Sequence, residues 1–265
     1  MAPVNLKNKV RNKSLFWYYK YNGKLPSITG NKDKTRADLE ANRLLLELPI
    51  LTAFRLLKHV THSKAQLMQD LFVLAETKLK KNGFFVEFGA TNGVDLSNTY
   101  LLEKEFGWSG ILAEPAKRWH ADLWNNRNCE IETNCVWQVS NATLTFNEAN
   151  IAKFSTINSY SAVDLHREAR KDGKAYDVKT ISLFDLLQKH NAPEKIDYLS
   201  IDTEGSELDI LSAFNFDRYQ ISVITCEHNY TAARDKIFSL LTRNGYVRKF
   251  QNLSEFDDWY VRPPS

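Results

Sequence analysis

One short stretch of the chain, YLSIDTEGSELDIL, holds four carboxylates within eight residues. Ser206 and Asp209 have the Ser-x-x-Asp spacing of a capping box, which predicts the start of a helix. Glu207 would lie in the first turn of that helix, where the helix dipole stabilises a negative charge. Asp202 and Glu204 have no comparable structural reason, because they lie between an apolar run and the helix start. We therefore expect Asp202 and Glu204 to face a ligand.

A glycine-bearing segment, VEFGATNG, includes the end of an earlier apolar run. Gly89 and Gly93 allow a tight turn and a close approach of the backbone to a ligand. Glu87, directly before this turn, is expected to accept hydrogen bonds from a cationic or hydroxyl-bearing ligand. Thr91 stands where the dinucleotide motif Gly-x-Gly-x-x-Gly has its middle glycine, which disfavours NAD. A glycine turn after a strand is also common as plain structure, so this segment alone identifies no ligand.

Two further residues follow predicted strands. Glu114 lies 21 residues after Gly93, where an acid can bind both hydroxyls of a ribose. Together with the glycine turn it favours a nucleoside ligand, and the structural alternative is a surface glutamate near a helix start. His228, in CEHNY, is the side-chain type most readily tuned to accept a proton near neutral pH. The alternative for His228 is a polar loop residue that only precedes the next helix.

The elements that must position these residues alternate between strand and helix. Buried strands are predicted at residues 84–88, 110–114, 196–201 and 221–227, and helices at 96–106, 207–214 and 232–243. Short connections between such elements predict a mainly parallel sheet with helices on both faces. In these sheets ligands bind beyond the carboxyl ends of the strands, which is where the residues above fall.

Composition and charge favour a soluble globular protein with a basic head. The 265 residues are 43% hydrophobic and 25% charged, and they contain no apolar run of transmembrane length. Three cysteines in no pattern and the lack of a signal-peptide core indicate a cytoplasmic protein. Residues 1–35 hold eight Lys or Arg and one Asp, a net +7 that leaves −4 on residues 36–265.

The basic head also contains aromatic residues, in FWYYKY at 16–21. This mixture suits contact with a membrane surface, a lipid-linked substrate or nucleic acid, and the alternative is a solvated arm whose aromatics fold back. The lack of a basic stripe elsewhere argues against a dedicated nucleic-acid binder. A peripheral contact of residues 1–35 with the inner face of a membrane stays open. We divide the chain into this arm with a helical extension at 1–62 and a main domain at 63–265, and the pattern fixes no oligomeric state.

Several of these segments resemble, in order, those of FkbM-type methyltransferases. They are QLMQDLFVL (66–74), GFFVEFGATNGVDLSNTYLLEKEFGWSGILAEP (83–115) and IDYLSIDTEGSELDIL (196–211). The similarity covers about residues 66–261 and is weakest at 129–180. It implies a class I methyltransferase fold, an α/β, Rossmann-like sheet of seven mainly parallel strands with the last strand antiparallel. It also implies bound S-adenosylmethionine and O-methylation of a hydroxyl, usually of a sugar in a polysaccharide or glycoconjugate pathway.

Carried over by motif, the resemblance assigns roles to individual residues. The donor's methionine part and ribose would be surrounded by Glu87, Gly89, Ala90, Asn92 and Gly93. Glu114 would hold the ribose hydroxyls. Ser97 and Asn98, which are also assigned to donor binding, would start the helix beside the glycine turn.

Two ways of activating the acceptor hydroxyl stay open. In the first, His228 or Asp202 is the general base and Glu204 orients the acceptor. In the second, Asp202, Glu204 and either Glu227 or His228 hold a divalent cation, which lowers the pKa of the hydroxyl. Oxygen ligands favour magnesium, calcium or manganese over zinc.

Three other functions compete with this interpretation. They are a NAD-dependent oxidoreductase, a methyltransferase acting on nucleic acid or protein, and a non-catalytic interaction domain on the same fold. Thr91 disfavours the first. The sequence after Ile201 lacks an Asn/Asp-Pro-Pro-aromatic motif, which counts against methylation of amino groups on bases.

Overall fold

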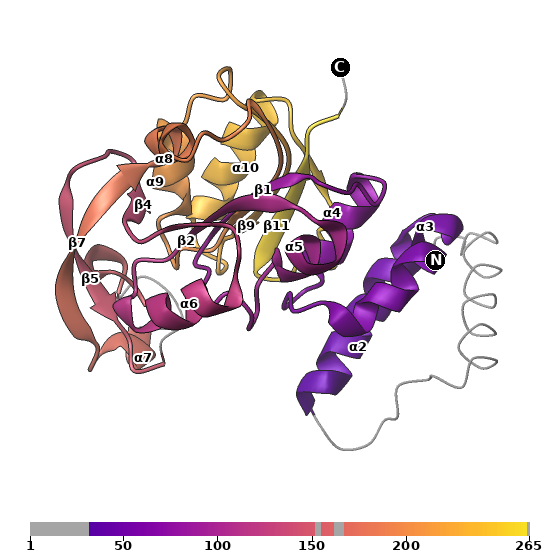
Figure 1. Ribbon diagram of the computed structural model, residues 1–265, viewed down its shortest axis with the longest axis horizontal. Coiled ribbons are helices and arrows are strands. Elements are labelled where there is room, and N and C mark those ends of the chain that lie inside the picture. Colours follow the sequence, from indigo (N-terminus) through magenta and orange to yellow (C-terminus); the bar gives the residue numbers. More distant parts are fainter. Residues whose placement is uncertain (1–31, 152–154, 162–166, 264–265) are drawn as a thin grey trace.

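A seven-stranded sheet forms the centre of the protein in its computed structural model, which describes residues 32–151, 155–161 and 167–263 (Figure 1). The strands lie in the order β10-β11-β9-β8-β1-β2-β3. Their bounds are β1 Phe84–Phe88, β2 Ser109–Ala113, β3 Glu130–Glu132, β8 Lys195–Ile201, β9 Gln220–Glu227, β10 Val247–Lys249 and β11 Asp257–Val261. The strands from β9 to β3 pair in parallel, and β11 pairs antiparallel with both β9 and β10. The predicted class I methyltransferase sheet, mainly parallel with its last strand antiparallel, is confirmed.

Helices cover both faces of this sheet. They are α4 Gln69–Glu76, α5 Tyr100–Phe106, α6 His120–Asn126, α8 Leu183–Lys189, α9 Glu207–Ala213 and α10 Ala233–Arg243. Alternate residues of a strand point to opposite faces, so Tyr198 of β8 packs in the core with α4, α5 and α6. Its neighbour Leu199 packs in a second core with α8, α9 and α10.

The helix after the glycine turn begins later than predicted, at Tyr100 rather than residue 96. Ser97 and Thr99 bond through their hydroxyls to the buried carboxylate of Glu87. These bonds hold the segment before α5 in an irregular path, which is the physical reason for the shorter helix.

A second sheet, at the left of Figure 1, has the strand order β4-β7-β5-β6. Its strands are β4 Cys135–Trp137, β5 Thr143–Glu148, β6 Thr156–Ile157 and β7 Lys174–Ser182. Short helices adjoin it in the chain, namely η2 Lys117–Trp119, η4 Asn158–Tyr160 and α7 Arg167–Arg170. Phe146 and Val178 belong to a separate small core on this sheet. This second sheet is not predicted from the sequence, because the resemblance is weakest in this region.

The N-terminal helices pack against the main domain. They are α2 Lys32–Glu47, α3 Ile50–Leu56 and the 3₁₀ helix η1 Leu57–His62. Leu44 and Leu56 lie in the same buried cluster as Trp259 of β11, and Arg36 forms an ion pair of 2.8 Å with Glu255. The basic, aromatic segment at 1–31 lies outside the described residues. None of the helices in the described ranges has the length and apolar character that crossing a bilayer requires.

Candidate active site

A cavity of about 230 Å³ opens beyond the carboxyl ends of β1, β2, β8 and β9, with the second sheet as its far wall. The main sheet and its loops contribute Glu87, Gly89, Thr91, Asp95, Asn98, Glu114, Asp202, Thr203, Glu204 and Glu227, and the second sheet contributes Cys135, Val136, Phe146 and Ile157. Six lining residues are acidic, and none of the described residues that line the cavity is a lysine, arginine or histidine. The cavity therefore offers carboxyl groups as hydrogen-bond acceptors to its ligand, with no cationic side chain among these lining residues.

The glycine turn after β1 passes directly against the loop after β8. Gly89 has a φ of +73°, and a Cβ at this position would lie 2.0 Å from the carbonyl oxygen of Asp202. Only glycine combines this conformation with so close an approach. The turn thereby brings the predicted donor-binding loop and the predicted catalytic loop to one place.

Four of the predicted donor-binding residues do not line the cavity; they are Ala90, Asn92, Gly93 and Ser97. Gly93 packs against Leu123 and Arg127, where a Cβ would come within 2.7 Å of both side chains. Asn92 Oδ1 accepts from the backbone N–H groups of Val94 and Asp95. In this structure these residues shape the loop.

Glu87 holds the segment before α5. Its carboxylate accepts from Ser97 Oγ at 3.0 Å and from the backbone N–H of Asn98 at 2.7 Å. The buried Arg127, which the sequence analysis missed, lies 3.9 Å from the same carboxylate and offsets its charge. Asn98 donates from Nδ2 to Ser200 Oγ, while its buried Oδ1 has no hydrogen-bond partner among the described residues. Because Asn98 lines the cavity, this oxygen is placed to accept from a ligand.

Glu114 follows β2 and faces the glycine turn. Its two oxygens accept from the backbone N–H groups of Thr91 and Ala116, each at 2.8 Å. Burial raises the pKa of Glu114 to about 7, and the charges of Asp202 and Glu148 also raise it, against the lowering effect of the two bonds. Each carboxylate oxygen keeps a further lone pair, which is what the binding of two ribose hydroxyls requires.

Asp202 and Glu227 lie side by side at the ends of the adjacent parallel strands β8 and β9. Their carboxyl groups form a hydrogen bond, which requires one proton between them. Burial raises the pKa of Asp202 to about 7. Burial, followed by the charge of Asp202, raises the pKa of Glu227 well above its ordinary value. The pair therefore shares one proton, and burial raises the pKa of both carboxyl groups.

Glu204 is held by a buried arginine that the sequence analysis did not single out. Arg170 of α7 places Nη2 2.8 Å from Glu204 Oε2, and Asn229 Nδ2 lies 3.4 Å from the same oxygen. No motif marks Arg170, since it lies in the region of weakest resemblance. Asp202, Glu204 and Glu227 each offer an oxygen within 4.8 Å of the others, so the predicted acidic cluster does form at the cavity.

His228 does not line this cavity, although its neighbours in the chain, Glu227 and Asn229, do. It lines a smaller adjacent pocket. Its Nδ1 accepts from the backbone N–H of Tyr230 at 3.0 Å, and Nε2 lies 3.8 Å from Asp258 Oδ1. Burial lowers the pKa of His228 despite this carboxylate.

The capping box predicted at Ser206 and Asp209 is wrong. Ser206 precedes α9, but its side chain caps no backbone N–H of that helix and donates to Thr203 Oγ1 at 2.8 Å. Its φ and ψ of −96° and 6° differ from the extended conformation that side-chain capping needs. Asp209 instead accepts from the hydroxyl of Tyr160 on η4. Glu207 does lie in the first turn, and its carboxylate accepts from the backbone of Thr203.

No curated protein matches this chain. Among solved structures, a precorrin-6y C5,15-methyltransferase from Geobacter metallireducens aligns over 72% of this chain and 85% of its own, with 11% identity and a TM-score of 0.37. A ribosomal protein L11 methylase from Lactobacillus delbrueckii aligns over 74% of this chain and 77% of its own, with 11% identity and a TM-score of 0.37.

The family model described as the methyltransferase FkbM domain matches residues 87–252. This match spans more than half of the chain and both sides of the acidic cavity, and the protein therefore belongs to the FkbM-domain methyltransferases.

Proposed function

We propose that this protein is an S-adenosylmethionine-dependent O-methyltransferase that acts on a hydroxyl of a sugar in a polysaccharide or glycoconjugate. The acidic lining of the cavity carries the proposal, with six acidic residues and no cationic one among the described lining residues. The donor bears a sulfonium and an ammonium group, which such a lining stabilises. The same lining would repel the two phosphates of NAD, which argues against an oxidoreductase.

Two groups in the cavity suit the polar ends of the donor. The unpartnered Oδ1 of Asn98 can accept from the ammonium group, and the carboxylate of Glu114 can accept from the ribose hydroxyls. Glu87 would not contact the donor itself. It would position Asn98 by accepting a hydrogen bond from the backbone N–H of that residue. When bound, the donor supplies a methyl group on a positively charged sulfur that needs no further activation.

Asp202 is the general base in this proposal. The proton of the acceptor hydroxyl would pass to the Asp202 carboxylate while the oxygen takes the methyl group, and the bond from that group to sulfur would break to leave the neutral thioether of S-adenosylhomocysteine. A base with a pKa near 7 combines a large deprotonated fraction at neutral pH with useful basicity. Protonated Glu227 orients Asp202 by donating to it. His228 suits the role less well, since its Nδ1 already accepts from Tyr230 and its ring lies outside the cavity.

A divalent cation on Asp202, Glu204 and Glu227 is the less favoured version. The proton between Asp202 and Glu227 would have to leave, and the guanidinium of Arg170, 2.8 Å from Glu204, opposes a second positive charge there. We expect exhaustive chelation to leave methyl transfer unchanged. Loss of turnover that manganese or magnesium restores would support the cation instead.

The nature of the acceptor rests on the same charge argument. An acidic cavity repels the phosphates of nucleic acid, whereas carboxylates readily accept from the several hydroxyls of a sugar. Peripheral membrane contact through residues 1–35 stays part of the proposal, with a lipid-linked glycan as acceptor. Four exposed apolar side chains on the helices that follow this arm support it, namely Leu39, Ile50, Leu51 and Phe54.

Calorimetry with S-adenosylhomocysteine and with NAD tests the ligand, and transfer of a labelled methyl group to a panel of free and lipid-linked glycans tests the acceptor. We expect binding of S-adenosylhomocysteine alone and transfer to at least one glycan. Removal of residues 1–35 should weaken only the reaction with lipid-linked acceptors. Binding of NAD would support the oxidoreductase, and binding of neither ligand would support a non-catalytic domain.

A further inference from the structure

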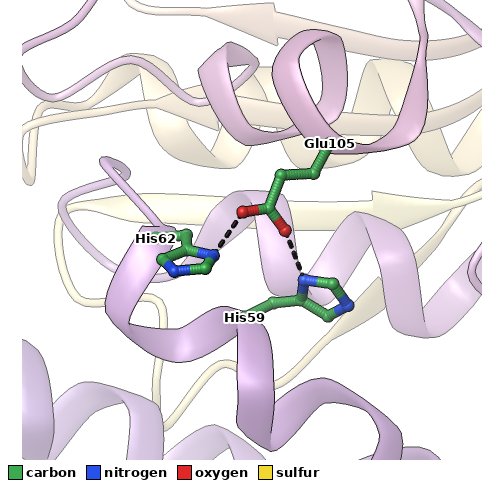
Figure 2. Close-up of side chains that lie close together, drawn as sticks. All are labelled: His59, His62 and Glu105. Carbon is green, nitrogen blue, oxygen red and sulfur yellow. Dashed lines mark hydrogen bonds and ion pairs between the residues drawn. The ribbon is translucent and has the colours of Figure 1, made fainter.

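Two histidines and a glutamate converge outside the acidic cavity, where the N-terminal helices meet the main domain. His59 and His62 lie three residues apart on the 3₁₀ helix η1, and side chains at this spacing lie above one another in a 3₁₀ helix. Figure 2 shows both imidazoles directed at the carboxylate of Glu105 from α5. His59 Nδ1 lies 2.6 Å from Oε2, and His62 Nδ1 contacts Oε1.

The three side chains offer the donor atoms of a transition-metal site. Each contributes one ligand atom, and these atoms lie within 4.8 Å of one another. Two imidazole nitrogens and one carboxylate oxygen form a ligand set that zinc uses with three protein ligands and one open position. We infer that His59, His62 and Glu105 bind a divalent transition-metal ion, with zinc as the best fit, which fastens the N-terminal helices to α5.

The surroundings favour a metal over two ordinary hydrogen bonds. The side chain of His62 is 57% exposed, so fixing it for one surface contact yields little free energy. This exposure also gives an ion an entry path and gives water access to the open position. The imidazole of His59 is oriented by the ring of Phe106, with ring centroids 4.8 Å apart.

Little movement separates this arrangement from a loaded site. Zinc with ligand bonds of about 2.0–2.1 Å and tetrahedral geometry holds its ligand atoms roughly 3.3 Å apart. The His59 nitrogen and the Glu105 oxygen are 2.6 Å apart, so they need to separate by less than about 1 Å. His62, at the exposed end of η1, can make the corresponding adjustment by rotating its side chain.

The test measures zinc binding by the full-length protein after removal of metal with a chelator and dialysis. We expect one zinc ion per chain by calorimetry, a higher Tm when zinc is added, and absorption bands of tetrahedral cobalt after substitution with Co²⁺. His62→Ala and Glu105→Gln should abolish both the stoichiometric binding and the rise in Tm. Because His62 is largely exposed, its variant should fold and keep the metal-free Tm of the wild type.

Two control variants test whether zinc binds at the cluster of His59, His62 and Glu105 and not at another site. His190 also lies between two glutamates, 3.3 Å from Glu132 and 3.4 Å from Glu130, but among the described residues these three do not bring their ligand atoms within 4.8 Å of one another. His190→Gln should bind zinc as the wild type does, and so should Asp202→Asn, which alters only the acidic cavity. Absence of saturable zinc binding by the wild type would overturn the inference, as would unchanged binding in His62→Ala.

Discussion

The carboxyl groups of Asp202 and Glu227 share a hydrogen bond across two adjacent parallel strands. The register of β8 and β9 sets Ile201 beside Cys226, so the next residue of each strand reaches the same edge of the sheet. Two buried carboxyls this close do not both ionise at neutral pH. In the proposed mechanism the shared proton lies on Glu227, so that Asp202 is the proton acceptor, although the two side chains carry the same group.

Asp202→Asn is expected to lower kcat/KM by about 10²–10⁴-fold, because it removes the proton acceptor. Binding of S-adenosylhomocysteine, measured by calorimetry, should stay within a few fold of the wild type. Glu227→Gln is the matched control, since its amide can donate to Asp202 as the protonated acid does. This variant should keep most of its activity. Equal loss in both variants would assign the base to the pair or to Glu227, and wild-type turnover in Asp202→Asn would exclude Asp202.

The pH dependence follows from the same group. Asp202 must be deprotonated to accept a proton, and burial raises its pKa to about 7 in the free enzyme. Thus kcat/KM should rise with pH and level off above about 7. The rise in kcat should occur at lower pH, because the bound sulfonium stabilises the carboxylate and lowers its pKa. Initial rates from roughly pH 5 to 9 check both statements. A profile of kcat/KM that is flat over this range would contradict them.

The central strands β1, β2, β8 and β9 could be predicted because each contains an apolar run that ends at a glycine turn or at polar residues. The same pattern placed Glu87, Glu114 and Asp202 at one edge, where the structure has them. Spacing alone could not show that the carboxylate of Glu87 accepts hydrogen bonds from Ser97 and Asn98. Those bonds depend on the path of a non-helical segment.

What the sequence left out depends on contacts between distant segments. Arg170 meets Glu204 only because a second sheet folds over the cavity, and no local pattern predicts that sheet. His228 does not line the cavity, and its ring contacts the backbone N–H of Tyr230 and the carboxylate of Asp258 instead. The position of a residue at the end of a strand does not predict these two contacts. Local rules also failed at Ser206, where the side chain bonds to Thr203 instead of capping the helix.

Gly89→Ala should lower the free energy of unfolding by more than the cost of placing alanine in a left-handed conformation. The added Cβ would also clash with the backbone of Asp202. Gly245 is the matched control, with a φ of +85° and nothing within 4 Å of a Cβ, whereas the Cβ at position 89 would meet the backbone of Asp202 at 2.0 Å. Gly245→Ala should lose about 1–3 kcal/mol of unfolding free energy. The loss in Gly89→Ala should be larger, and binding of S-adenosylhomocysteine should fall as well. Denaturant unfolding and calorimetry measure the two effects, and equal losses in both variants would contradict the close approach.

Arg170→Met is expected to cost about 3–5 kcal/mol of unfolding free energy, because it leaves the buried carboxylate of Glu204 without its guanidinium partner. The double variant Arg170→Met with Glu204→Gln removes both charges and should recover part of this loss. Chemical denaturation of the two single variants and the double variant gives the coupling between the residues. Additive losses would show that the ion pair contributes nothing beyond packing.

The same variant tests whether Arg170 keeps cations away from the acidic cluster. Without the guanidinium, Asp202, Glu204 and Glu227 offer three oxygens within 4.8 Å and no compensating charge from position 170, which suits manganese or magnesium. Manganese should therefore raise the Tm of Arg170→Met and leave the Tm of the parent unchanged. Both measurements belong in a His62→Ala background, so that the histidine cluster contributes no binding. An equal rise in Tm in the parent would show that the cluster holds a cation despite Arg170, and would revive the metal-assisted version of the reaction.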